Sequence, residues 1–172
     1  MITLVTGGSK SGKSAFAEKI AGNFSGKKYY IATMKPYGDE AFQAIECHRK
    51  MRAGKGFETI EKYTDLGEIN FAERGSVLLE CMGNLCANEM FREEIVNPVD
   101  KIISDIKRLE SISEKLVIVT NEVGSDGINY SPETMRYITH MGKINRKIGE
   151  FADNIIECVY GIPLVLKGEL NC

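Results

Sequence analysis

An octapeptide near the start of the chain, Gly7-Gly8-Ser9-Lys10-Ser11-Gly12-Lys13-Ser14, matches the pattern GxxxxGK[ST]. An apolar, β-prone run at residues 2–6 precedes it, and an amphipathic helical pattern at residues 13–24 follows it. A glycine-rich turn from a strand into a helix can direct several backbone N–H groups inward, toward the positive end of the helix dipole. The sequence therefore predicts a phosphate-binding loop built into an α/β fold.

Within this loop we expect Lys13 to bridge the β and γ phosphates of a nucleotide, and the Ser14 hydroxyl to bind Mg²⁺. From average residue usage, a chance match in a chain of this length has a probability of roughly one in a hundred. The strand before the loop and the helix after it lower that probability further. We therefore expect all eight loop residues to contribute to nucleotide binding.

Strand and helix patterns alternate along the rest of the chain. Apolar, β-rich runs occur at residues 2–6, 28–32, 76–80, 116–120 and 154–160, and helical patterns at 13–24, 39–52, 84–96, 99–111 and 132–152. This alternation is typical of a mainly parallel sheet covered by helices on both faces. Residues 163–167, after Gly161, could add an antiparallel strand at one edge. We predict one P-loop NTPase domain over residues 1–172.

Composition excludes several classes of protein. The chain has 172 residues, 43% of them hydrophobic, which is enough for one sizeable core, and its formal net charge is -2. No overall field draws it to nucleic acid or anionic lipid, and no apolar run approaches the roughly 18 residues of a membrane span. No leader sequence is visible, and the five cysteines include no CxxC pair. We expect a cytoplasmic protein with mostly buried, inert thiols.

The loop alone does not select an enzyme class. Residues 65–67 and 120–124 do not match the DxxG and Asn-Lys-x-Asp signatures of GTPase switch proteins. Phosphoryl transfer with Mg²⁺ also calls for an acid at the end of a buried strand, and both Glu80 and Glu122 follow apolar runs. The sequence leaves open which of the two faces the metal.

His48 lies in a basic helical segment with Arg49 and Arg52. An imidazole can attack phosphorus, and neighbouring guanidinium groups would neutralise the attacked phosphates. The alternative is a surface helix with a solvated basic face. We assign no role to the second histidine, His140, while Thr33 at the end of a strand run could contact the nucleotide or cap the chain.

Taken together, these residues resemble the bifunctional adenosylcobinamide kinase and adenosylcobinamide-phosphate guanylyltransferase family of cobalamin assembly. The resemblance runs through nearly the whole chain. It is carried by residues 4–14, Tyr30-Ile31-Ala32-Thr33, His48 with Arg52, Glu61, Leu78-Leu79-Glu80-Cys81, Thr120-Asn121-Glu122-Val123-Gly124, Gly142, Asn145 and Gly161. The loop is generic, but its combination with His48 and the two tetrapeptides Leu-Leu-Glu-Cys and Asn-Glu-Val-Gly is specific.

The resemblance implies phosphorylation of the aminopropanol hydroxyl of adenosylcobinamide, followed by transfer of GMP from GTP through a guanylylated histidine. His48 occupies the position of that nucleophile, and Lys13 is the second catalytic residue. The implied nucleotide contacts are the loop, Ala32, Thr33, Met34, Arg49, Lys50, Met51, Arg52, Glu61 and Glu80. The implied partners are Mg²⁺, GTP or ATP, a corrinoid substrate and further copies of the chain in a homotrimer.

The chain differs from the usual family pattern in three places: after the histidine, at residues 124–130, and at Tyr137-Ile138-Thr139. The last change removes two charges, so corrinoid or phosphate handling could differ there. The alternative function is a small-molecule P-loop kinase acting on another alcohol, without guanylyl transfer. A nucleotide-sensing regulator without turnover is a third possibility, which the missing switch signatures disfavour.

Overall fold

A computed structural model of the chain describes residues 1–36, 46 and 54–169. The strands are β1 Ile2–Thr6, β2 Lys28–Ala32, β3 Phe57–Glu61, β4 Ser76–Glu80, β5 Lys115–Val119, β6 Asn154–Val159 and β7 Ile162–Lys167. The helices are α1 Lys13–Gly22, α3 Met82–Met90, α4 Pro98–Ile112 and α5 Pro132–Phe151, with a short 3₁₀ helix at Leu66–Glu68. Apart from residue 46, the helix expected at residues 39–52 lies outside the described residues.

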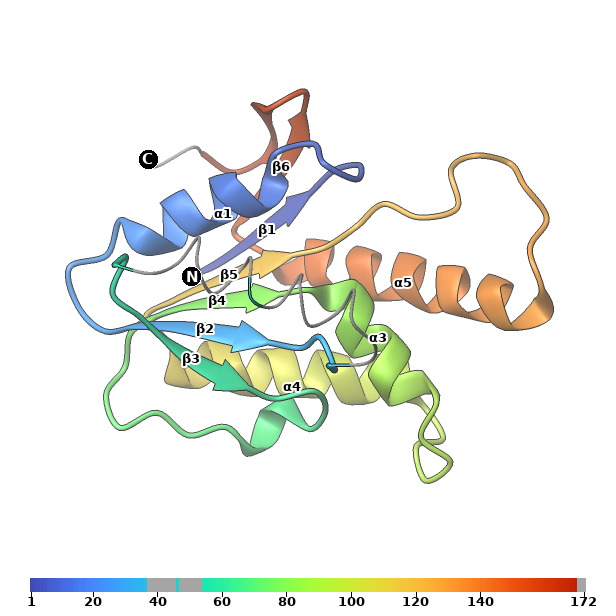
Figure 1. Cartoon of the computed structure of the whole chain (residues 1–172), viewed down its shortest axis with the longest axis horizontal. Helices are drawn as coiled ribbons and strands as arrows, with labels where there is room; N and C mark the ends of the chain where they lie inside the picture. The colour runs from blue at the N-terminus through green and yellow to red at the C-terminus, as the bar shows by residue number, and fades with distance from the viewer. Residues whose placement is uncertain (37–45, 47–53, 170–172) are drawn as a thin grey trace.

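The strands form one seven-stranded sheet in the order β3-β2-β4-β5-β1-β6-β7 (Figure 1). All neighbouring pairs are parallel except β6 and β7, which are antiparallel. The predicted fold class, including the antiparallel strand at the C-terminal edge, is therefore confirmed. Strand β3 was not predicted, because Phe57–Glu61 lies at the other edge of the sheet, carries two charged residues and has no fully buried residue.

Helices cover both faces of the sheet, as the apolar strands require. One buried cluster joins the sheet to α3, α4 and α5, and includes Leu79, Leu85 and Ile106. The other joins the opposite face to α1, and includes Val5, Ile20 and Val117. Because strands β1, β4 and β5 have apolar side chains on both faces, they are fixed at the centre of the sheet.

Local chemistry sets where helices α4 and α5 begin. The Asn97 side chain accepts a hydrogen bond from the Asp100 N–H (3.2 Å), and the Ser131 side chain accepts one from the Thr134 N–H (3.3 Å). In each helix a proline occupies the first turn, where its missing N–H costs nothing. The predicted helix start at Pro132 is confirmed.

The helix predicted at residues 84–96 is wrong at both ends, since α3 spans Met82–Met90. The apolar residues that extended the pattern are exposed: Phe91 is 57% exposed and Val96 is 99% exposed. They lie in the turn that leads to α4, so their spacing does not indicate a buried helix face.

Among the described helices, none combines the length and apolar character needed to cross a bilayer.

Candidate functional site

The phosphate-binding loop connects β1 to α1 and depends on two glycines in the left-handed region. Gly7 has φ +143° and Gly12 has φ +91°. A Cβ at Gly7 would lie 2.5 Å from the carbonyl oxygen of Cys158, and a Cβ at Gly12 would lie 3.2 Å from Gly161 Cα. Both positions therefore need glycine for two reasons: the positive φ, and the close approach of β6 to Gly7 and of the turn after β6 to Gly12.

Hydrogen bonds hold the loop in shape. The Ser11 N–H donates to the Gly8 carbonyl (3.3 Å), and the Gly161 N–H donates to the Ser11 carbonyl (2.9 Å). The ammonium of Lys13, a largely buried side chain, donates to the Gly8 carbonyl at 3.0 Å. The loop thus presents a fixed cation at the start of a ten-residue helix, an arrangement suited to an anion.

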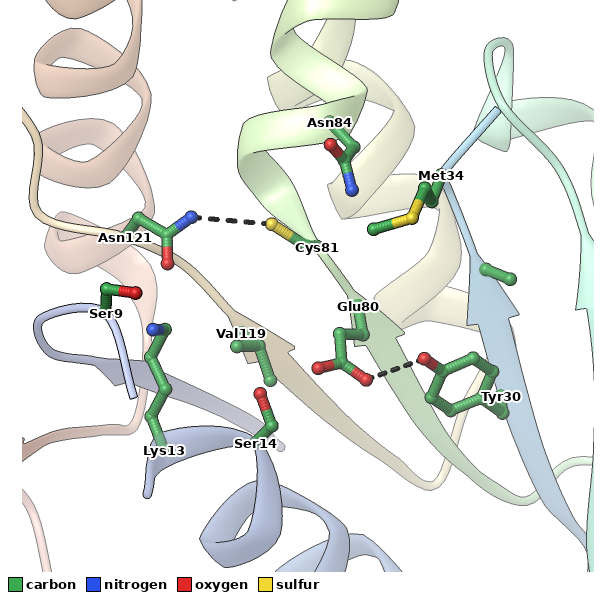
Figure 2. A pocket seen from close by; sticks show the side chains of 11 residues that line it. Ser9, Lys13, Ser14, Tyr30, Met34, Glu80, Cys81, Asn84, Val119 and Asn121 are labelled. Carbon is green, nitrogen blue, oxygen red and sulfur yellow. Dashed lines mark hydrogen bonds between the residues drawn. The ribbon is translucent and has the colours of Figure 1, made fainter. Parts of the chain in front are cut away.

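A cavity of about 400 Å³ opens beside this loop (Figure 2). It lies at the carboxyl ends of the central strands, where ligands bind in open α/β sheets. Its lining residues are Ser9, Lys13, Ser14, Tyr30, Ala32, Met34, Glu80, Cys81, Asn84, Val119 and Asn121. Six of them were expected at the site from the sequence, namely Ser9, Lys13, Ser14, Ala32, Met34 and Glu80.

The structure distinguishes the two acids that the sequence left open. Glu80, the last residue of β4, lines the cavity, and its Oε2 accepts a 2.6 Å hydrogen bond from the buried hydroxyl of Tyr30. Glu122 comes three residues after the end of β5, is exposed and is not among the residues that line the cavity. Glu80 is therefore the acid that faces the phosphate-binding loop.

The donors in this cavity suit a hard cation. The Ser14 hydroxyl and the Glu80 carboxylate line the same space, and Mg²⁺ prefers oxygen ligands while keeping several waters and substrate phosphates. In the described part of the chain, no group of three His, Cys, Asp or Glu residues is placed to hold a metal ion. A P-loop magnesium site does not need such a group, because the nucleotide supplies part of the coordination.

Thr33 has a structural role in the described geometry. Its side chain is fully buried, its hydroxyl accepts a hydrogen bond from the Cys81 N–H (2.8 Å) and lies 2.9 Å from the Cys81 carbonyl oxygen. The Asn88 amide adds a 2.8 Å hydrogen bond to the Thr33 carbonyl and a 2.9 Å bond to the Tyr63 carbonyl. These contacts join the ends of β2, β3 and β4 behind the cavity.

The remaining predicted site residues are placed differently. Glu61 ends β3 beside Ala32, is exposed, and accepts a 3.3 Å hydrogen bond from the Tyr63 hydroxyl. It does not line the cavity. His48, Arg49, Lys50, Met51 and Arg52 lie outside the described residues.

Two cysteines of the core, Cys86 and Cys158, are buried, as expected. Burial raises the pKa of the Cys86 thiol to about 12. Burial also raises the pKa of Cys158, although the nearby Lys13 ammonium acts in the opposite direction. Neither thiol is a thiolate nucleophile at neutral pH. Cys81 is half-buried at the cavity wall, where its sulfur lies 3.6 Å from the Asn121 amide nitrogen.

Sequence reasoning missed five lining residues, namely Tyr30, Cys81, Asn84, Val119 and Asn121. Tyr30 was taken as part of an apolar strand, and Asn84 as part of a helical pattern. Asn121 could have been found, because it follows a central strand at the edge where ligands bind. No comparable signal marks Asn84, whose position depends on how α3 packs.

Three comparisons place this chain among known proteins. The family model described as "Cobinamide kinase / cobinamide phosphate guanyltransferase" matches residues 3–166. The bifunctional adenosylcobalamin biosynthesis protein CobU of Escherichia coli (strain K12) is 31% identical, covering 97% of this chain and 100% of that protein. The protein of the same name from Salmonella typhimurium is 28% identical over 97% of this chain and 100% of its own length.

Among solved structures, the flagellar accessory protein FlaH from Methanocaldococcus jannaschii superposes with a TM-score of 0.48 and 14% sequence identity. The match covers 98% of this chain and 78% of that one. The nearly complete coverage by the sequence relatives is what assigns the chain to a family.

Proposed function

The chain belongs to the cobinamide kinase / cobinamide phosphate guanyltransferase family, and on that premise we propose that it phosphorylates adenosylcobinamide and then transfers GMP from GTP to the product. The observation that carries this proposal is the shared cavity, where Lys13, Ser14 and Glu80 converge. A cation, a hydroxyl and a carboxylate at one edge of a parallel sheet are the groups that phosphoryl transfer from a nucleotide requires.

In the kinase step, backbone N–H groups of the loop and the Lys13 ammonium hold the β and γ phosphates of GTP or ATP. The negative charge on these phosphates grows toward the leaving oxygen in the transition state, where Lys13 stabilises it. The Ser14 hydroxyl would hold Mg²⁺, which neutralises phosphate charge when bound. Glu80, fixed by Tyr30, faces the same end of the nucleotide.

In the guanylyl step, we propose His48 as the nucleophile. A nitrogen–phosphorus bond forms between its imidazole and the α-phosphorus of GTP, and the bond to the pyrophosphate leaving group breaks. The phosphate of cobinamide phosphate then attacks the α-phosphorus and releases the imidazole. Arg49 and Arg52, close to His48 in sequence, would neutralise the attacked phosphates. We also retain Ala32, Thr33, Met34, Lys50, Met51 and Glu61 as proposed nucleotide contacts.

Thr33 and Glu61 enter this proposal in a restricted way. The Thr33 side chain is buried behind the cavity. It would therefore act on nucleotide binding indirectly, by fixing the position of the end of β2. Glu61 lies at the end of the neighbouring strand, outside the cavity lining.

By family resemblance we further propose that the enzyme acts in the cytoplasm as a homotrimer. Sedimentation analysis of the purified protein would test the trimer.

The proposed kinase activity is tested with cobinamide and γ-labelled GTP or ATP. Transfer of label to cobinamide is expected for the wild-type enzyme and is lost in Lys13→Ala, because Lys13 is the cation fixed at the phosphates. Lys19→Ala is the matched control, since Lys19 is an exposed lysine of α1 outside the loop and outside the cavity lining. Undiminished transfer by Lys13→Ala would remove Lys13 from the mechanism, and no transfer by the wild-type enzyme would refute the kinase assignment. Phosphorylation without any guanylylated product would favour a simple alcohol kinase.

A further inference from the structure

The cavity has two chemically different walls. One wall is the phosphate-binding loop with Lys13, and a second wall carries the amide side chains of Asn84 and Asn121, with Asn121 drawn next to Ser9 of the loop (Figure 2). Among the described lining residues, Lys13 is the one cation, and it lies on the loop side. A triphosphate is therefore drawn to the loop, while the amide wall suits a neutral, hydrogen-bonding group.

Asn121 is held in place from behind. Its backbone carbonyl accepts a 3.1 Å hydrogen bond from the Asn145 amide, and the Asn145 carbonyl oxygen accepts a 2.6 Å bond from the Thr120 hydroxyl. The Asn121 side-chain nitrogen lies 3.6 Å from the Cys81 sulfur. Figure 2 shows the side-chain oxygen of Asn121 directed toward the loop. Asn145 on α5 thus orients an amide that projects from the end of β5.

The packing of α3 brings Asn84 close to the same space. Its neighbour Gly83 is buried, and a Cβ there would lie 3.3 Å from the Asn121 side-chain nitrogen and 2.8 Å from the Tyr137 hydroxyl oxygen. The absence of a side chain at residue 83 therefore lets the first turn of α3 approach Asn121. Figure 2 shows the Asn84 amide pointing from this turn into the cavity.

We propose that Asn84 and Asn121 form the acceptor subsite, which binds the neutral amide-alcohol arm of cobinamide and directs its hydroxyl at the γ-phosphorus of the nucleotide. The inference rests on the proposed kinase function. A primary amide both donates and accepts hydrogen bonds, so two of them can pair with an alcohol and the amide group beside it. The two amides carry no charge, which suits a neutral acceptor beside the anionic donor that Lys13 binds.

The transfer step balances at these groups. The acceptor oxygen forms a bond to the γ-phosphorus, and the bond from that phosphorus to the β,γ-bridging oxygen breaks. The electron pair leaves with the nucleoside diphosphate on the loop. The hydroxyl proton is released to solvent water as the new oxygen–phosphorus bond forms.

Steady-state kinetics of Asn84→Ala and Asn121→Ala test this subsite. With γ-labelled GTP saturating, we expect the KM for cobinamide to rise about tenfold in each variant, the size of one lost hydrogen bond. The KM for GTP, and the binding of a fluorescent GTP analogue, should stay within about twofold of wild type. Asn70→Ala is the control, because Asn70 is an exposed amide bonded to the Glu68 carbonyl, away from the cavity.

The possible results distinguish failure of the acceptor subsite from failure of the proposed kinase function. Asn84→Ser and Asn121→Ser, which keep a hydrogen-bonding group, should recover part of the cobinamide affinity if the alanine variants are unstable. Unchanged KM for cobinamide, or equal losses for cobinamide and GTP, would overturn the subsite while leaving the kinase intact. A wild-type protein that phosphorylates no cobinamide would overturn the proposed function, and the subsite with it.

Discussion

The hydroxyl of Tyr30 donates a 2.6 Å hydrogen bond to Oε2 of Glu80 at the end of the neighbouring strand. Tyr30 is only 4% exposed, so packing fixes its ring and thereby the position of the carboxylate. A carboxylate held in one position can contact a metal-bound nucleotide or an acceptor hydroxyl without first rearranging. Such preorganisation lowers the free-energy barrier of the reaction.

Replacement of Tyr30 by phenylalanine removes this hydrogen bond and keeps the ring. Hydrogen bonds to charged groups contribute about 1.5 to 3 kcal/mol, so we expect kcat for cobinamide phosphorylation to fall by about tenfold or more. The KM for GTP should change little, since Lys13 and the loop are untouched. Initial-rate measurements separate the two constants. Unchanged kcat would show that Glu80 needs no help from Tyr30.

Two adjacent glycines of the loop should respond differently to alanine. Gly7→Ala places a Cβ 2.5 Å from the Cys158 backbone carbonyl at a positive φ, whereas a Cβ at Gly8 meets no atom within 4 Å. We expect Gly7→Ala to abolish GTP binding and to lower the melting temperature. The added Cβ would force the backbone of the loop or of Cys158 to shift, and either shift is energetically unfavourable. Gly8→Ala should retain both properties. Thermal unfolding with and without GTP makes the comparison, and equal behaviour of the two variants would contradict the described loop geometry.

A cluster of charged residues beneath the site ties the 3₁₀ helix to α3 and α4. The ammonium of Lys101 contacts Asp65 (2.9 Å), Glu89 (2.8 Å) and Asp105 (2.8 Å), and Glu89 is fully buried. Lys101→Met leaves the Glu89 carboxylate with fewer partners, and we expect a loss of about 3 kcal/mol in unfolding free energy. Lys147→Met, which breaks an exposed pair with Asp100, should cost less than about 1 kcal/mol. Urea denaturation of both variants checks the difference; similar losses would contradict it.

The same cluster predicts a pH dependence of stability. Burial acts to raise the pKa of Asp65, but hydrogen bonds from Lys101 and Arg92 outweigh burial and hold this pKa below its usual value of 3.8. The folded state therefore favours ionised Asp65, and this contribution is present above pH 3.8 and lost as the pH falls through the lowered pKa. In urea titrations from pH 6 to about pH 2.5, wild type should lose stability more steeply than Asp65→Asn. Parallel curves would exclude Asp65 as a source of acid sensitivity.

The sequence predicted the loop, the five buried strands and the edge hairpin, because each has a strong local pattern. It did not predict β3, because Phe57–Glu61 forms an edge strand of the sheet and has no regular alternation of apolar and polar residues. It also did not separate Glu80 from Glu122, since both follow apolar runs. Whether an acid ends a strand or lies three residues beyond it depends on strand register, which only the paired sheet defines.

Lining residues were predicted where a motif names them and missed where packing places them. Lys13 and Ser14 belong to a loop whose chemistry follows from its pattern. Asn84 reaches the cavity because Gly83 lets α3 approach Asn121, a contact between distant segments that no local pattern reports.

The most direct test of the two-step account uses GTP labelled at the α-phosphate and follows label bound to the protein. We predict an acid-labile, alkali-stable adduct that forms in wild type and His140→Ala, is absent in His48→Ala and Lys13→Ala, and is discharged by cobinamide phosphate. Undiminished labelling of His48→Ala would contradict the proposed mechanism.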